Sequence, residues 1–234
     1  STGVGGFEED APYRSGDGKV IISGNAYHDS TVGILVDGNF YDTTNANSLG
    51  VYSITLDEIA RGVYTFAVYA EDKNSVKSST FSTSFTVTGA RTSALGNINI
   101  APSILVEPDP VNPGSPLIFS GYAIPNSTIS IENGRINRSA SQVLSAVSDS
   151  SGEWSVSVDT NGYSVDTYQV RAKADQTGGD FTNFSEYTFY GVGQSAEVPI
   201  NADLNRDGKV NLIDFSILLF WWGGDGGDSD PPAD

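Results

Sequence analysis

The sequence predicts an all-β protein built from two β-sandwich modules in tandem. Between residues 19 and 89, short runs rich in Val, Ile, Thr, Tyr and Phe alternate with turn residues, which is typical of the strands of a sandwich. Residues 20–31 match residues 117–128 without a gap, so the pattern occurs twice. A length of 234 residues with 26 Gly and 10 Pro suits two compact domains of about 100 residues each, with many tight turns.

The strands of the first copy are expected where the β-forming runs lie. These runs are residues 20–27, 31–36, 51–56, 63–71 and 79–87. The match between the copies continues further along the chain, pairing residues 47–53 with 149–155 and residues 62–68 with 166–172. The second copy therefore has a longer insertion near residues 135–142.

Each copy repeats the same local features. A glycine precedes an expected tight turn, and an aromatic residue, Tyr52 or Trp154, alternates inward from a hairpin. A second inward tyrosine, Tyr64 or Tyr168, opens the next strand. Because these aromatics recur at equivalent positions, we interpret them as core residues, and a sugar-stacking platform for carbohydrate is the secondary interpretation.

The two copies resemble the bacterial immunoglobulin-like modules that occur in tandem on exported surface proteins. The resemblance covers roughly residues 19–89 and 104–192. It implies immunoglobulin-like sandwiches and an extracellular or cell-surface location in a prokaryote. On this basis the expected segments are listed in chain order: an extended N-terminal segment at 1–18, module 1 at 19–90, a linker at 91–103, module 2 at 104–192, a connector at 193–202, a calcium loop and helix at 203–222, and an acidic flexible tail at 223–234.

The linker region is expected to be stiff, because five prolines fall between residues 102 and 116. We therefore expect the two modules to sit end to end.

Residues 203–214 fit the twelve-residue calcium loop, in which oxygen ligands recur at positions 1, 3, 5, 7, 9 and 12. The expected Ca2+ ligands are Asp203, Asn205, Asp207, the carbonyl of Lys209, Asn211 and Asp214. Gly208 stands at position 6, where the sharp turn requires it. Calcium takes six to eight hard oxygens, which a loop supplies only by curling around the ion. The other interpretation, a polar surface turn, does not account for all six positions in register.

The loop resembles a dockerin type I half-repeat, an EF-hand-like unit. The terminal Asp214, the Val-Asn pair before it and the apolar run after it carry this resemblance. The family pairs two such repeats to bind cohesin modules outside the cell, whereas one copy is present here. Leu212 and Ile213 stand where dockerins often carry Ser or Thr recognition residues, so ordinary cohesin binding is not expected.

An apolar helix is expected after the loop, over residues 215–222. The residues expected to dock against a partner are Phe215, Leu218, Leu219, Trp221 and Trp222. A helix that is apolar on nearly every face must be covered. The cover is either module 2 or another chain.

Composition excludes several function classes. A formal charge of −17 repels nucleic acid and anionic lipid, and no apolar run approaches the ~20 residues that span a bilayer. Without Cys, Cys-His dyads are excluded, and the single histidine, His28, aligns with Pro125 and reads as a surface turn residue. Glu71 and Asp72 lie at an expected module end, where a solvated turn is favoured over a second calcium site.

We expect no enzyme. The expected function is that of a calcium-stabilised extracellular or cell-surface structural or interaction protein, such as a subunit of a filament or an adhesive assembly with protein partners or self-association. The alternative is the targeting or scaffold-attachment region of a larger secreted polysaccharide-degrading enzyme, attached through the dockerin-like segment.

Overall fold

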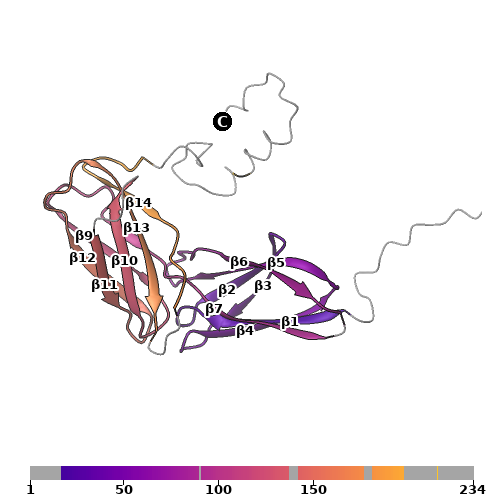
Figure 1. The fold of residues 1–234 in the computed structure, drawn as a ribbon. Coiled ribbons are helices and arrows are strands. Elements are labelled where there is room, and N and C mark those ends of the chain that lie inside the picture. Colours follow the sequence, from indigo (N-terminus) through magenta and orange to yellow (C-terminus); the bar gives the residue numbers. More distant parts are fainter. Residues whose placement is uncertain (1–16, 90, 137–141, 177–180, 198–214, 216–234) are drawn as a thin grey trace, which may run out of the picture.

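The computed structural model describes residues 17–89, 91–136, 142–176, 181–197 and 215. Within these residues the chain is an all-β protein of two sandwiches (Figure 1). Each sandwich has a three-stranded sheet and a four-stranded sheet. The predicted fold class of tandem sandwiches is confirmed for these residues.

Module 1 comprises the first seven strands. They are β1 Gly18–Asn25, β2 Thr31–Val36, β3 Asn39–Asn45, β4 Val51–Ile59, β5 Gly62–Glu71, β6 Phe81–Val87 and β7 Thr92–Asn99. Its sheets have the strand orders β4-β1-β7 and β3-β2-β5-β6.

Module 2 comprises the next seven strands. They are β8 Leu105–Glu107, β9 Pro116–Tyr122, β10 Thr128–Arg135, β11 Gln142–Val147, β12 Glu153–Asp159, β13 Asp166–Asp175 and β14 Thr188–Val192. Its sheets have the orders β12-β9-β8 and β11-β10-β13-β14. Strand β9 is the repeat equivalent of β1, so the two modules share the same arrangement of sheets.

The inward faces of the two copies are filled by equivalent residues. Val20 and Ile22 of β1 and Leu117 and Phe119 of β9 are fully buried, as period-two alternation requires. Tyr52 and Trp154 are also buried, at 1% and 2% exposure, which confirms that these aromatics form core and leaves no sugar platform there. Tyr64 is half-buried against the module 1 core and Tyr168 is buried in module 2.

Tyr168 has a further role at the start of its strand. Its hydroxyl donates to the carbonyl of Ser164, four residues earlier, at 3.3 Å. This is the geometry of the tyrosine corner found in immunoglobulin-like sandwiches.

Residues 91–103, expected to be a linker, contain β7, which is a strand of module 1. β7 pairs in parallel with β1, and Ile98 and Ile100 are buried in the module 1 core. The prolines of the expected stiff segment begin only at Pro102, so nothing prevents Thr92–Asn99 from pairing. Because β7 contains Gly96 and several small polar residues, its composition resembles that of a connector.

The two modules fill one equivalent position differently. In module 2, β8 lies beside β9 and runs antiparallel to it, whereas in module 1 the position beside β1 is taken by β7, which runs parallel to it. We call β7 and β8 the flanking strands. Because β7 follows β6 instead of preceding β1, the chain leaves module 1 at the end where β1 and β5 finish.

Gly24 and its equivalent Gly121 stand inside strands, each one residue before the strand end that leads into a turn. A Cβ on Gly24 would overlap the backbone of Ile98, and a Cβ on Gly121 would overlap the backbone of Ser103. Gly24 therefore admits the close approach of β7 itself, and Gly121 admits that of the segment just before β8. The repeated glycine serves sheet packing.

Strand β3 was not predicted; its burial pattern is almost wholly exposed, so it lacks the alternation that marks a half-buried strand. The expected insertion near residues 135–142 lies largely outside the described residues; β10, which leads into it, has eight residues where β2 has six.

Candidate functional site at the junction of the modules

The predicted calcium site lies outside the described residues. The same is true of all six of its expected ligands, Asp203, Asn205, Asp207, Lys209, Asn211 and Asp214, and of Leu218, Leu219, Trp221 and Trp222 among the docking residues. Phe215 is described, in a helical conformation with 54% of its surface exposed. The calcium site and the docking surface remain predictions.

The candidate site in the described residues is the junction where the two modules touch. The ends that meet there carry turns at equivalent positions of the repeat. A Cβ on Gly50 would lie 3.0 Å from Pro125, and a Cβ on Gly152 would lie 3.7 Å from the backbone nitrogen of His28. Gly50 corresponds to Gly152 in the repeat, and His28 corresponds to Pro125. The two contacts are therefore the same contact made twice, once in each direction.

Equivalent backbone conformations support this correspondence. Asp29 and Asn126 have φ angles of 52° and 57°, and Gly50 and Gly152 have φ angles of 80° and 77°. Asp, Asn and Gly are the residues that adopt the left-handed region at least cost. The turns at the junction are thus fixed by local sequence in both modules.

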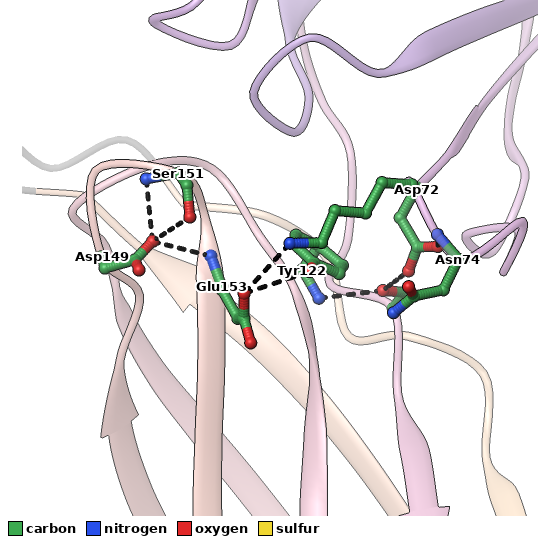
Figure 2. A network of polar contacts seen from close by, with 8 residues as sticks. Asp72, Asn74, Tyr122, Asp149, Ser151 and Glu153 are labelled. Atoms are coloured by element: carbon green, nitrogen blue, oxygen red, sulfur yellow. Dashed lines mark hydrogen bonds and ion pairs between the residues drawn. The ribbon is translucent and has the colours of Figure 1, made fainter.

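A side-chain cap holds the glycine turn in each module. Asn47 Oδ1 accepts hydrogen bonds from the backbone nitrogens of Leu49 and Val51 at 2.9 and 3.0 Å. Asp149 does the same for Ser151 and Glu153, at 2.8 and 3.0 Å (Figure 2). The Ser151 hydroxyl donates to Asp149 as well, and this bond, more than the backbone bonds, lowers the pKa of that carboxyl.

Asp72 is the centre of the buried polar network at the junction. The residue is 7% exposed, and its Oδ1 accepts from the backbone nitrogens of Asn74 and Val76 at 2.8 and 3.0 Å. Its Oδ2 accepts from the Ser103 hydroxyl at 2.7 Å, and Ser103 Oγ accepts from the backbone nitrogen of Tyr122 at 3.0 Å (Figure 2). One carboxylate of module 1 is thereby joined through the connecting segment to β9 of module 2.

The expectation of a solvated turn at Glu71 and Asp72 is wrong for Asp72. Its carboxylate is buried because Ser103 and the turn amides supply the hydrogen bonds that water would otherwise provide. No group of three or more His, Cys, Asp and Glu residues in the described part of the chain has a metal-binding arrangement.

Lys73 spans the junction on its exposed side. Its ammonium lies 3.2 Å from Glu153 Oε2 and 4.8 Å from the centre of the Tyr122 ring, and the Tyr122 hydroxyl donates to the same carboxylate oxygen at 3.2 Å. Contact with Tyr122, and then with Glu153, raises the pKa of the Lys73 ammonium. An exposed pair of this kind contributes modest energy, and its geometry chiefly fixes orientation.

The segment between the modules is itself held by module 1. The Tyr27 hydroxyl donates to the carbonyl of Ala101 at 2.6 Å, and Ile100, Ala101, Ser103 and Ile104 are buried. Burial, and then the neighbouring Asp72, raises the pKa of Tyr27. A segment with buried residues and fixed hydrogen bonds differs from a free linker.

Further contacts join the two modules outside the Asp72 network. The backbone nitrogen of Glu186 donates to Ser79 Oγ at 2.6 Å, and Asn99 Nδ2 donates to the carbonyl of Phe181 at 3.5 Å. Tyr122 of module 2 also belongs to the hydrophobic cluster of module 1. The modules therefore share both polar and apolar contacts.

A hollow of about 400 Å³ opens at the junction. Its lining residues are Tyr27, His28, Asp29, Ser30, Thr31, Glu71, Asp72, Lys73, Tyr122 and Ser151. His28 lies in a turn, as expected, with Nδ1 3.2 Å from Asp29 Oδ2. Two of these lining residues already have partners, since Asp72 accepts from Ser103 of the connecting segment and Lys73 pairs with Glu153 of module 2.

Sequence reasoning missed the roles of Ser103, Tyr122 and Glu153. Ser103 is separated from Asp72 by 31 residues and Tyr122 from Ser103 by 19, so no local pattern links them. The signal that was available is the repeat itself, because equivalent glycine turns at equivalent ends predict equivalent surfaces.

Comparison of the chain with known proteins gives matches among solved structures alone. No family model matches it, and no curated protein matches it. Among solved structures it is similar to a tetra-tandem repeat from the extending region of a large adhesion protein, with 16% identity over 76% of this chain and 49% of that one and a TM-score of 0.32. The present chain thus spans about half the length of that structure.

Two further similar structures come from different kinds of protein. The chicken interferon gamma receptor alpha chain has 18% identity over 76% of this chain and 98% of that one, with a TM-score of 0.36. The fibronectin(III)-like modules of CbhA from Clostridium thermocellum have 9% identity over 80% and 93%, with a TM-score of 0.25. Likenesses at this level carry no argument about function, and the class of tandem immunoglobulin-like sandwiches rests on the strand order described above.

Proposed function

We propose that this chain is a non-catalytic structural or interaction protein of the prokaryotic cell surface or extracellular space, stabilised by calcium and able to take part in a filament or adhesive assembly. The observation that carries the proposal is the junction. There Asp72, Lys73, Tyr122 and Glu153 are used to fasten one sandwich to the other. A fixed pair of sandwiches suits the spacing and presentation of binding surfaces.

Composition supports the calcium part of the proposal. With zero Cys, stability depends on packing and hard-metal ligation, and a formal charge of −17 attracts divalent cations. No helix among the described residues is long and apolar enough to cross a membrane.

The calcium part of the proposal has a direct test. Calcium bound to the loop of residues 203–214 stabilises the folded form by mass action, so the melting temperature should rise when calcium is added. Asp203→Ala together with Asp214→Ala should abolish that rise. The control is Asp225→Ala together with Asp228→Ala, which removes the same charge outside the loop. An unchanged melting temperature on adding calcium to the unsubstituted chain would reject the calcium site.

Assembly is tested by light scattering and electron microscopy, with calcium and with chelator. Large polymers that disappear after Trp221→Ala and Trp222→Ala would support docking of the apolar segment on another chain. A monomer under both conditions would reject self-assembly while leaving the calcium result unaffected.

The dockerin-like spacing favours one second candidate, the attachment region of a secreted polysaccharide-degrading enzyme. Immobilised cohesin modules distinguish the two. Calcium-dependent retention would favour attachment, whereas Leu212 and Ile213 at the recognition positions lead us to expect no retention.

A further inference from the structure

We propose that the junction is a pseudo-two-fold interface, in which the same end of each module faces the other, and that it holds the two modules as one rigid bent body. The inference concerns the shape and rigidity of the chain. It does not depend on calcium binding or on assembly.

The course of the chain brings equivalent ends of the two modules together. β1 and β5 of module 1 run toward the junction, and so do their equivalents β9 and β13 of module 2 (Figure 1). β7 runs parallel to β1, so the chain leaves module 1 at the junction end. β8 runs antiparallel to β9, so the chain also enters module 2 at the junction end. The usual head-to-tail order of tandem sandwiches would require the chain to leave module 1 at the opposite end.

The contacts across the junction are reciprocal. In a two-fold interface, if residue i contacts residue j, the equivalent of j contacts the equivalent of i. Gly50 faces Pro125 and Gly152 faces His28, which satisfies this condition with repeat equivalents. In each module the added Cβ would also lie 2.5 Å from the alanine carbonyl oxygen that precedes the turn, of Ala26 or of Ala123.

The contacts of Lys73 with Glu153 and Tyr122, which we call the latch, break this symmetry. Lys73 of module 1 reaches Glu153 and Tyr122 of module 2. In the repeat, Glu153 corresponds to Val51 and Tyr122 corresponds to Asn25, so the opposite direction lacks the carboxylate and the ring. The latch selects one arrangement from an otherwise self-complementary pair of surfaces.

The connecting segment also contributes to the interface. Ser103 is 2% exposed and joins Asp72 to the backbone of β9, while Ala101 accepts a hydrogen bond from Tyr27. Bending at the junction would break these buried hydrogen bonds. A hinge is therefore not expected at the segment that sequence reasoning treated as a linker.

The test measures the distance between the far ends of the modules. Because the chain has no Cys, Val63→Cys and Val143→Cys can be labelled specifically, and both positions are about 70% exposed, at 70% and 73%. Val63 lies near the start of β5 and Val143 near the start of β11, at the ends remote from the junction. Single-molecule energy transfer between the two labels should give one narrow distribution.

The junction variant combines Lys73→Ala with Ser103→Ala in the labelled chain. It removes the latch and the bridge to Asp72, and the distribution should broaden at least two-fold while circular dichroism stays unchanged. The control combines Lys19→Ala, whose ion pair with Asp57 lies within module 1, with Ser145→Ala, an exposed position on β11. The control should keep the narrow distribution.

Two results would overturn the proposal. One is a broad distribution in the unsubstituted labelled chain, which would show a hinge. The other is a junction variant that stays folded and as narrow as the control. If the junction variant failed to fold, Lys73→Ala alone, which removes only an exposed group, must still shift or broaden the distribution for the proposal to stand.

Discussion

Substitution of Gly24 by alanine tests the close packing of β1 against β7. The added Cβ would overlap the carbonyl oxygen of Ile98 and lie 2.5 Å from its carbonyl carbon and 2.8 Å from its nitrogen. Contacts under 3.0 Å are essentially not seen for real Cβ atoms, so the carbonyl carbon alone must move by 0.5 Å (3.0 − 2.5). The obstacle is backbone, which cannot rotate away as a side chain can.

The cost follows from what this displacement breaks. Overpacking of a close contact costs about 1–3 kcal/mol. The Ile98 carbonyl also accepts a hydrogen bond from Tyr52 at 3.0 Å, and the Ile100 nitrogen donates to Asn25 at 2.8 Å. Weakening these two bonds adds about 1 kcal/mol each. We expect Gly24→Ala to lower the free energy of unfolding by about 3–5 kcal/mol.

The assay is urea unfolding followed by far-ultraviolet circular dichroism, with Gly96→Ala as the matched control. Gly96 lies in the same strand pair, and its added Cβ would lie 3.5 Å from Ser23 Oγ, an ordinary contact. The control should be neutral or stabilising by about 0.4–1 kcal/mol, because alanine restricts the unfolded chain. If Gly24→Ala were as stable as Gly96→Ala, the close approach of β7 and its place in module 1 would be wrong.

Three further predictions follow from the junction and the cores. His28→Pro should be tolerated, with stability unchanged to within about 1 kcal/mol, because Pro125 occupies the equivalent position; a loss of more than 2 kcal/mol in urea unfolding would contradict the equivalence. Tyr168→Phe should lower the free energy of unfolding by about 1 kcal/mol in the same assay, because the hydrogen bond to Ser164 is lost. An unchanged free energy of unfolding would argue against the tyrosine corner. The raised pKa of Tyr27 means that the folded form holds the phenolic proton more tightly than the unfolded form does. Its contribution to stability is therefore full below pH 10.0, the ordinary pKa, and is lost as pH rises above it; tyrosinate absorbance should show fewer ionised tyrosines in the folded chain than after unfolding at the same pH.

Much of each module was predictable because its signals are local. The alternation that buries Val20 and Ile22 has a period of two residues, and the gapless match to residues 117–128 shows the same pattern again. Tyr52 and Trp154 were assigned to cores by their recurrence. β3 escaped prediction because its side chains are exposed and carry no alternation.

The sequence by itself therefore determined two repeated sandwiches, the strands with a buried face and the aromatic cores, since each depends on residues a few positions apart. Tertiary structure decided which chain segment fills the place beside β1, and from that, which ends of the modules meet. Asn25 and Asn99, joined across β1 and β7, are 74 residues apart, and Asp72 reaches Ser103 across 31 residues. Pairing over such separations depends on the path of the whole chain, which no local periodicity encodes. The rigid junction is therefore visible only in the folded molecule.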